Sequence, residues 1–263
     1  MDISLKFFYK MKKMRIVCKI ASEVLEFIAP YIKPNVSTGK LDSLCHQFIV
    51  NEKHAVPAAL GYKGFPKSVC ISVNDVVCHG IPSNEKKLKN GDILNIDVSI
   101  MKDGFYGDTS KMFIVGTPCS LAYRLCKVTE KSLYLAIQLI KPGLRLRAIG
   151  KAIQNFVEIE NFSVVRNYCG HGIGRKFHDN PQVLHYDAYD NGVILKQGMS
   201  FTIEPMVNSG CADTYIMRDG WTVKTKDHSL SAQYEHTVFV TKYGCEIMTL
   251  RSDEIIPHIY NNI

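Results

Sequence analysis

The sequence of 263 residues lacks any long hydrophobic segment. No stretch approaches the roughly 18 uninterrupted apolar residues that indicate a transmembrane helix. The N-terminal segment is basic, and it contains no run of about 7 to 15 apolar residues before a small-residue cleavage site. We therefore expect neither a membrane span nor a signal peptide.

Paired thiols are also missing. The chain has nine cysteines, an odd number, and no two of them form a C-x-x-C pair. This usage is typical of reduced thiols in a cytoplasmic protein. Only one tryptophan occurs, and the composition, 46% apolar and 22% charged, is ordinary for a globular chain that can bury a substantial core.

Acidic residues do not balance the basic ones, because the formal net charge is +7. Such an excess can mark a surface that meets RNA, including ribosomal RNA. More often it forms a solvated face, so ribosome contact is one of two interpretations. The early basic residues are Lys6, Lys10, Lys12, Lys13, Arg15 and Lys19.

Apolar periodicity predicts four amphipathic helices, in two pairs. About ten residues precede the first helix, which ends near Pro30. Ser37 or Thr38 is a plausible N-cap of the second helix. The apolar positions that define the helices span residues 17–27, 41–48, 125–139 and 149–156.

The two helix pairs share their spacing. An offset of 108 residues separates Pro34 from Pro142, and the same offset separates Gly64 from Gly172. A run of such matches favours an internal duplication, each half being a helix pair followed by antiparallel strands, although coincidence among common residue types is the alternative. We predict one domain, residues 1–263, with halves at about 11–117 and about 118–252.

Two aspartates occur in a predicted β-hairpin. The alternating run around Asp97 indicates one strand, and Asp108 lies in a second strand beyond an Asp103-Gly104 turn signal. A two-residue turn pairs Ser99 with Asp108, so both carboxylates lie on one face of the hairpin. Two like charges on a buried sheet face are unfavourable unless something neutralises them.

The second half supplies further metal-ligating side chains. Glu204 and Glu235 each interrupt an apolar strand-like run, and His171 in CGHGIG is the best nitrogen ligand among them. Four carboxylates and one imidazole suit Mn, Fe, Co or Zn. Two divalent ions cancel four negative charges, and a water between them is acidified to hydroxide near neutral pH. Taken singly, each residue could instead be a capping or solvent-facing acid, or a structural histidine.

An ordered set of motifs resembles bacterial type I methionine aminopeptidases: SVNDVVCHGIP, NGDILNIDVSIMKDGFYGDTS, CGHGIGRKFH, GMSFTIEPM and DGWTVKTKDHSLSAQYEHT. The resemblance extends from about residue 11 to residue 252. It implies the α+β pita-bread (creatinase/aminopeptidase) fold, with two pseudo-symmetric halves around a central antiparallel sheet flanked by helix pairs. It also implies removal of the N-terminal methionine from nascent proteins and peptides, with a preference for a small second residue.

The resemblance also carries the family's metal ligands onto Asp97, Asp108, His171, Glu204 and Glu235, which would hold two divalent ions. It implies that hydroxide at this centre attacks the first peptide bond. Glu204 is then the candidate that moves the proton towards the leaving amine. His178 would stabilise the carbonyl oxygen, and His79 would contact the nitrogen after the scissile bond.

The methionine side chain needs an apolar pocket. The residues that match the family's pocket are Tyr62, Phe65, Cys70, Phe177 and Trp221. Some members carry tyrosine at the position of Phe65 and histidine at that of Lys63, so a histidine role there is lost. A weaker match to a monovalent cation site involves Asn74, Val76 and Ser231.

Two alternatives remain. One is a proline-directed peptidase of the same fold, whose members generally carry a sizeable extra N-terminal domain. The other is a non-catalytic, ribosome-associated protein on this scaffold. Loss of metal ligands would favour that alternative, and none of the predicted metal ligands is lost. We expect a cytoplasmic monomer that acts on N-terminal methionine peptides and nascent chains and makes no membrane contact.

Overall fold

The structure, a computed structural model, describes residues 3–189 and 192–256. Every pairing between strands in these two ranges is antiparallel. Among the described residues, no helix has the length and hydropathy needed to cross a bilayer.

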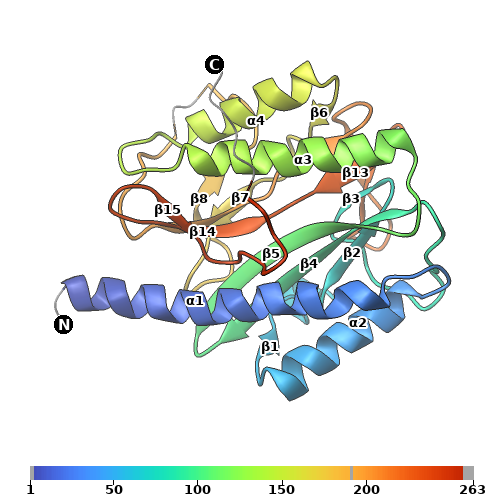
Figure 1. Ribbon diagram of the computed structural model, residues 1–263, viewed down its shortest axis with the longest axis horizontal. Helices are drawn as coiled ribbons and strands as arrows, with labels where there is room; N and C mark the ends of the chain where they lie inside the picture. Colours follow the sequence, from blue (N-terminus) through green and yellow to red (C-terminus); the bar gives the residue numbers. More distant parts are fainter. Residues whose placement is uncertain (1–2, 190–191, 257–263) are drawn as a thin grey trace.

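The helices lie in two pairs on opposite sides of the strands (Figure 1). Helices α1 (Ile3–Ile28) and α2 (Thr38–Gln47) cover one side. Helices α3 (Ser120–Gln138) and α4 (Arg147–Ile159) cover the other. The predicted α+β arrangement, with antiparallel strands flanked by two helix pairs, is therefore present.

The helix ends follow local signals, with one exception. Helix α1 ends before Pro30, and the side chain of Ser37 accepts the backbone N–H of Lys40 at 3.1 Å, which makes Ser37 the N-cap of α2. The exception is the start of α1 at Ile3, because the expectation that about ten residues precede it was wrong. The ring of Phe7 packs 5.4 Å from that of Phe239, so a tertiary contact extends the helix.

The first half contains a four-stranded sheet built on one long hairpin. Strand β4 (Ile93–Lys102) pairs with β5 (Phe105–Ile114), with β1 (Val56–Pro57) and with β2 (Cys70–Val73). Short helical turns come before β4 in the chain, at Ala29–Tyr31 (η1), Phe48–Glu52 (η2, a π-helix) and Tyr62–Gly64 (η3).

The second half supplies most of the remaining strands. A five-stranded sheet has the order β15 (Cys245–Ile247), β14 (His236–Val240), β9 (Ser200–Ile203), β7 (Gly170–Gly172), β8 (Asp179–Val183). Two three-stranded sheets are β13 (Ser231–Gln233), β10 (Met206–Asn208), β6 (Ser163–Val164) and β11 (Thr214–Ile216), β12 (Val223–Thr225), β3 (Val76–Cys78).

Hydrogen bonds join β5 directly to the segment around β14. The hydroxyl of Thr109 donates to the carbonyl of Glu235 at 2.7 Å, and the hydroxyl of Thr237 donates to the carbonyl of Asp108 at 2.7 Å. Ser110 and Glu235 also form an isolated antiparallel bridge. The seam between the halves therefore runs through two of the predicted metal ligands.

Candidate active site

The hairpin brings Asp97 and Asp108 together as predicted. Asp97 lies opposite Ser110, and Ser99 lies opposite Asp108. The hydroxyl of Ser99 donates to Asp108 Oδ1 at 2.9 Å. Asp97 Oδ1 is buried and has no hydrogen-bond partner among the described residues, so it lacks the compensation that a buried acceptor normally has.

Glu204 and Glu235 do not lie within strands, and that expectation was wrong. Glu204 follows the last residue of β9, and Pro205 comes next, so the ladder ends there because proline has no N–H to donate. Glu235 lies between β13 and β14, where the chain leaves one sheet and enters another. Glu204 lies at a break in pairing, whereas the backbone of Glu235 pairs with Ser110 of the hairpin through an isolated bridge.

Local hydrogen bonds orient Glu204. The hydroxyl of Thr202 donates to Glu204 Oε1 at 2.8 Å, and the amide of Gln233 donates to Oε2 at 3.3 Å. The backbone N–H of Glu204 donates to Nε2 of His185 at 3.1 Å. These three partners have no signal in the sequence, because their role depends on pairing between distant segments.

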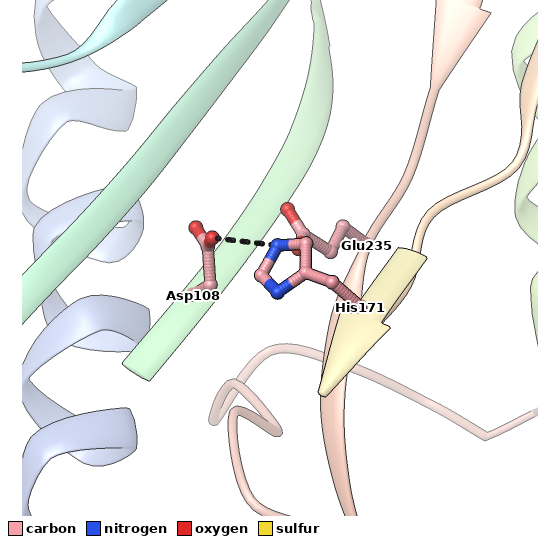
Figure 2. A group of neighbouring side chains, drawn as sticks. All are labelled: Asp108, His171 and Glu235. Atoms are coloured by element: carbon pink, nitrogen blue, oxygen red, sulfur yellow. Dashed lines mark ion pairs between the residues drawn. The ribbon is translucent and has the colours of Figure 1, made fainter. Parts of the chain in front are cut away.

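His171 projects from β7 towards the carboxylates (Figure 2). Its Nδ1 lies 3.1 Å from the carbonyl oxygen of Gly172. Because a carbonyl oxygen only accepts hydrogen bonds, Nδ1 carries the proton and Nε2 keeps its lone pair. Nε2 lies 3.7 Å from Asp108 Oδ2 and 3.8 Å from Glu204 Oε1. One ligand atom each from Asp108, His171 and Glu235 lie within 4.8 Å of one another.

Burial raises the pKa of every carboxyl in this group, and neighbouring carboxylates add to the rise for Asp97, Glu204 and Glu235. The pKa values of Asp97 and Glu235 lie well above the ordinary range, first because of burial and then because of neighbouring carboxylates. Burial and Asp108 raise the pKa of Glu204 to about 8. Burial also raises the pKa of Asp108, and His171 opposes that rise. Bound cations remove this repulsion, so the crowded donors and the partnerless Asp97 oxygen fit a divalent metal centre.

A cavity of about 350 Å³ adjoins these groups. Its size suits a small ligand. It is lined by every residue that the sequence analysis assigned to metal, catalysis or the methionine pocket: Asp97, Asp108, His171, Glu204, Glu235, His79, His178, Tyr62, Phe65, Cys70, Phe177 and Trp221. Their common location is a structural fact, while their individual roles stay predictions.

Aromatic rings form one wall of the cavity. Tyr62 packs against Phe177 with ring centroids 4.9 Å apart, and Phe65 packs against Trp221 at 5.2 Å. The ring of His178 lies 5.0 Å from that of Tyr62. Cys70 of β2 is paired with Asp97 of β4, so the apolar wall continues directly into the carboxylate group.

Two of the three cavity histidines, His79 and His178, are neutral at pH 7. Burial lowers the pKa of His79 to about 4. The His178 side chain is partly exposed, but the rings of Tyr62 and Phe177 pack against it, and burial lowers its pKa to about 3. A neutral imidazole can donate one hydrogen bond and accept another.

Several other residues line the cavity but were not predicted to do so from the sequence: Ala59, Lys63, Ser99, Asn167, Tyr168, Cys169 and Met206. A signal was present for some of them. Tyr168 and Cys169 directly precede the glycine-rich segment around His171, and Met206 follows Glu204 by two positions. Asn167 has no signature of its own.

The residues of the weak monovalent-cation match lie near one another. The carbonyl of Asn74 accepts the N–H of Ser231 at 2.9 Å, and its side-chain oxygen accepts the N–H of Ile93. Val76 pairs with Lys224 across β3 and β12. Cation binding there stays a prediction.

Comparison with known proteins identifies the family. The sequence pattern of "Metallopeptidase family M24" matches residues 12–242. The chain is 64% identical to the methionine aminopeptidase of Escherichia coli K12 over 262 residues, which cover 100% of this chain and 99% of that protein.

Solved structures agree with this relationship. The methionine aminopeptidase of Rickettsia prowazekii superposes with a TM-score of 0.90 at 54% identity, covering 92% of this chain and 97% of that one. The prolidase of Pyrococcus furiosus, at 18% identity and a TM-score of 0.73, covers 93% of this chain and 64% of that one and shares the fold alone. The chain therefore belongs to metallopeptidase family M24 and, within it, to the bacterial type I methionine aminopeptidases with the pita-bread fold.

Proposed function

We propose that this chain is a metal-dependent aminopeptidase that removes N-terminal methionine from peptides and proteins, including nascent chains, when the second residue is small. The observation that supports this proposal most directly is that an apolar wall and a group of buried carboxylates lie side by side in one cavity. An apolar wall of aromatic rings and Cys70 suits a methionine side chain. Buried carboxylates next to it suit cations that recognise a free α-amino group and a carbonyl oxygen.

The metal-holding set is Asp97, Asp108, His171, Glu204 and Glu235. Its four carboxylates match two divalent ions, and the oxygen-rich donor set is compatible with Fe, Mn, Co or Zn. When bound, such ions supply hydroxide at neutral pH and polarise the scissile carbonyl. Asn74, Val76 and Ser231 would hold a monovalent cation away from this centre.

The chain's own residues supply proton transfer and orientation. Glu204, with both carboxylate oxygens oriented by Thr202 and Gln233, takes up a proton and delivers it to the leaving amine. His178 donates a hydrogen bond to the carbonyl oxygen as negative charge develops on it. His79, neutral at pH 7, accepts the N–H that follows the scissile bond.

We also propose that the chain works as a cytoplasmic monomer with one metallopeptidase domain over residues 1–263. The nine cysteines are all free thiols, as a reducing compartment favours. The basic residues of α1 provide a surface for ribosomal RNA. Ribosome binding that ignores both salt concentration and neutralisation of Lys12 and Lys13 counts against that contact.

A peptide assay tests the activity. We expect metal-stripped enzyme to be inactive on Met-Ala-Ser and to regain turnover when Mn²⁺, Fe²⁺, Co²⁺ or Zn²⁺ is restored. Ala-Pro-Ala should not be cleaved. Cleavage of the proline peptide but not of the methionine peptide assigns the chain to the proline-directed peptidases instead.

Metal binding has a second readout that does not depend on activity. Saturating Mn²⁺ at about 100 times its Kd should stabilise the stripped protein by about 2.7 kcal/mol, measured as a shift in thermal unfolding. Asp108→Asn removes a charge from the group and should abolish most of that shift. An equal shift in the variant contradicts the assignment of Asp108 as a ligand.

A further inference from the structure

The opening of the cavity carries one positive charge that the reaction does not require. Three of the cavity-lining residues are exposed, namely Lys63, Asn167 and His178, and they mark where the cavity meets solvent. Lys63 is the one lysine or arginine among the described lining residues. Lys63 therefore supplies a lysine ammonium charge at this opening.

A hydrogen-bonded turn presents Lys63. It lies in η3 with φ of 46°, between Gly61 and Gly64, whose φ values are 81° and 87°. The N–H of Gly61 donates to the carbonyl of Phe65 at 2.8 Å, which closes the turn. This turn places the lysine backbone beside the cavity.

The ammonium group stays on the cavity side of this turn. Lys63 Nζ lies 5.4 Å from the ring centroid of Tyr62, and that ring stacks on His178. In the part of the chain that the structure describes, no acidic side chain forms an ion pair with Lys63. A cation held beside the opening, and not neutralised there, is available to a ligand.

We infer that Lys63 is a specificity-determining residue that makes the enzyme prefer peptides with an acidic side chain at the third position. The inference rests on the proposed function. Methionine occupies the ring-lined pocket and the second residue is small, so the third side chain is the first that can reach a charge at the opening.

Amidated peptides Met-Ala-Xaa-Ser, with Xaa as Asp, Asn or Lys, test this inference in the metal-loaded enzyme. We expect kcat/KM to be about threefold higher for Asp than for Asn, and lower for Lys than for Asn, since an exposed pair contributes a few-fold at most. The differences should appear in KM more than in kcat, and they should shrink between about 0.02 M and about 0.5 M salt.

Variants separate a role for Lys63 from a general effect of charge. Lys63→Met should remove the Asp preference, and Lys63→Arg should restore it. Lys67→Met removes the same charge from the same segment, but Lys67 does not line the cavity, so the preference should persist. An unchanged preference in Lys63→Met, or an equal loss in Lys67→Met, overturns the inference.

The neutral peptide distinguishes this inference from the proposed function. Cleavage of the Asn peptide without any preference between Asp and Lys contradicts the role of Lys63 alone. Failure to cleave all three peptides contradicts the proposed function, and the inference falls with it.

Discussion

At the scale of single residues, Glu204 differs from the other acids of the site because neutral donors hold both of its oxygens. Thr202 contacts Oε1, and Gln233 contacts Oε2. Asp97, by contrast, has one oxygen without any protein partner among the described residues. These surroundings suit Asp97 to metal ligation, and they suit Glu204 to ligation combined with proton transfer, because its orientation persists when its charge changes.

Glu204→Gln tests that role. Glutamine keeps the shape and can still meet Thr202, but it cannot carry the proton, so we expect kcat to fall about 10²- to 10⁴-fold with the fold retained. The measurement is steady-state turnover of Met-Ala-Ser together with circular dichroism. Glu246→Gln, which alters a surface acid paired with Arg15, should leave turnover unchanged. Near-normal turnover in Glu204→Gln means that another group carries the proton.

At the scale of elements, the β4–β5 hairpin brings the two aspartates together. Asp103 and Gly104 both have positive φ, 54° and 72°, as a two-residue hairpin turn requires. That turn sets the register that aligns Ser99 with Asp108. A slip by one residue would turn one aspartate to the opposite face.

Gly104→Ala should therefore destabilise the protein. An alanine is strained at φ of 72°, although its Cβ would meet nothing closer than Arg175 at 3.9 Å, so we expect a loss of about 1 kcal/mol in the free energy of unfolding. Urea denaturation measures it. Gly244→Ala is the control, since Gly244 is not in the left-handed region and the nearest atom lies 3.7 Å away. Equal effects of the two substitutions would show that the turn conformation is not the cause.

At the scale of the whole molecule, a segment near the C-terminus ties helix α3 to strand β14 next to the site. Glu254 Oε1 accepts hydrogen bonds from Tyr134 of α3 and from Arg251, and it lies 3.1 Å from Nε2 of His236. The hydroxyl of Thr249 lies 2.9 Å from Nδ1 of the same histidine. His236 directly follows Glu235, so this buried network supports a predicted metal ligand from behind.

Glu254→Gln should weaken the whole fold in a pH-dependent way. Burial alone would raise the pKa of Glu254, but His236 and Arg251 outweigh burial and lower it to about 2, below the ordinary value of 4.5. The depressed value means that the charged form stabilises the protein fully above pH 4.5, and that this contribution is lost as the pH falls through about 2.

Urea denaturation at pH 7 and about pH 3.5 tests this expectation. The loss in Glu254→Gln should be about 2 kcal/mol at pH 7, because Arg251 is left buried without its charged partner, and it should be smaller at the lower pH. Asp253→Asn changes an exposed acid paired with Lys111 and should have little effect at either pH. A loss in Glu254→Gln that grows as the pH falls contradicts the assigned sign.

The sequence by itself determined the helix pairs, the hairpin register and the acidic and histidine side chains predicted to bind metal. These features depend on local periodicity, on one turn and on residue types, all of which act over a few neighbouring positions. Only the tertiary structure decided that Glu204 and Glu235 lie outside the regular strands, that Lys63 stands at the opening of the cavity, and that Glu254 supports His236. Those outcomes depend on contacts between segments far apart in the chain, whose energies no local pattern records.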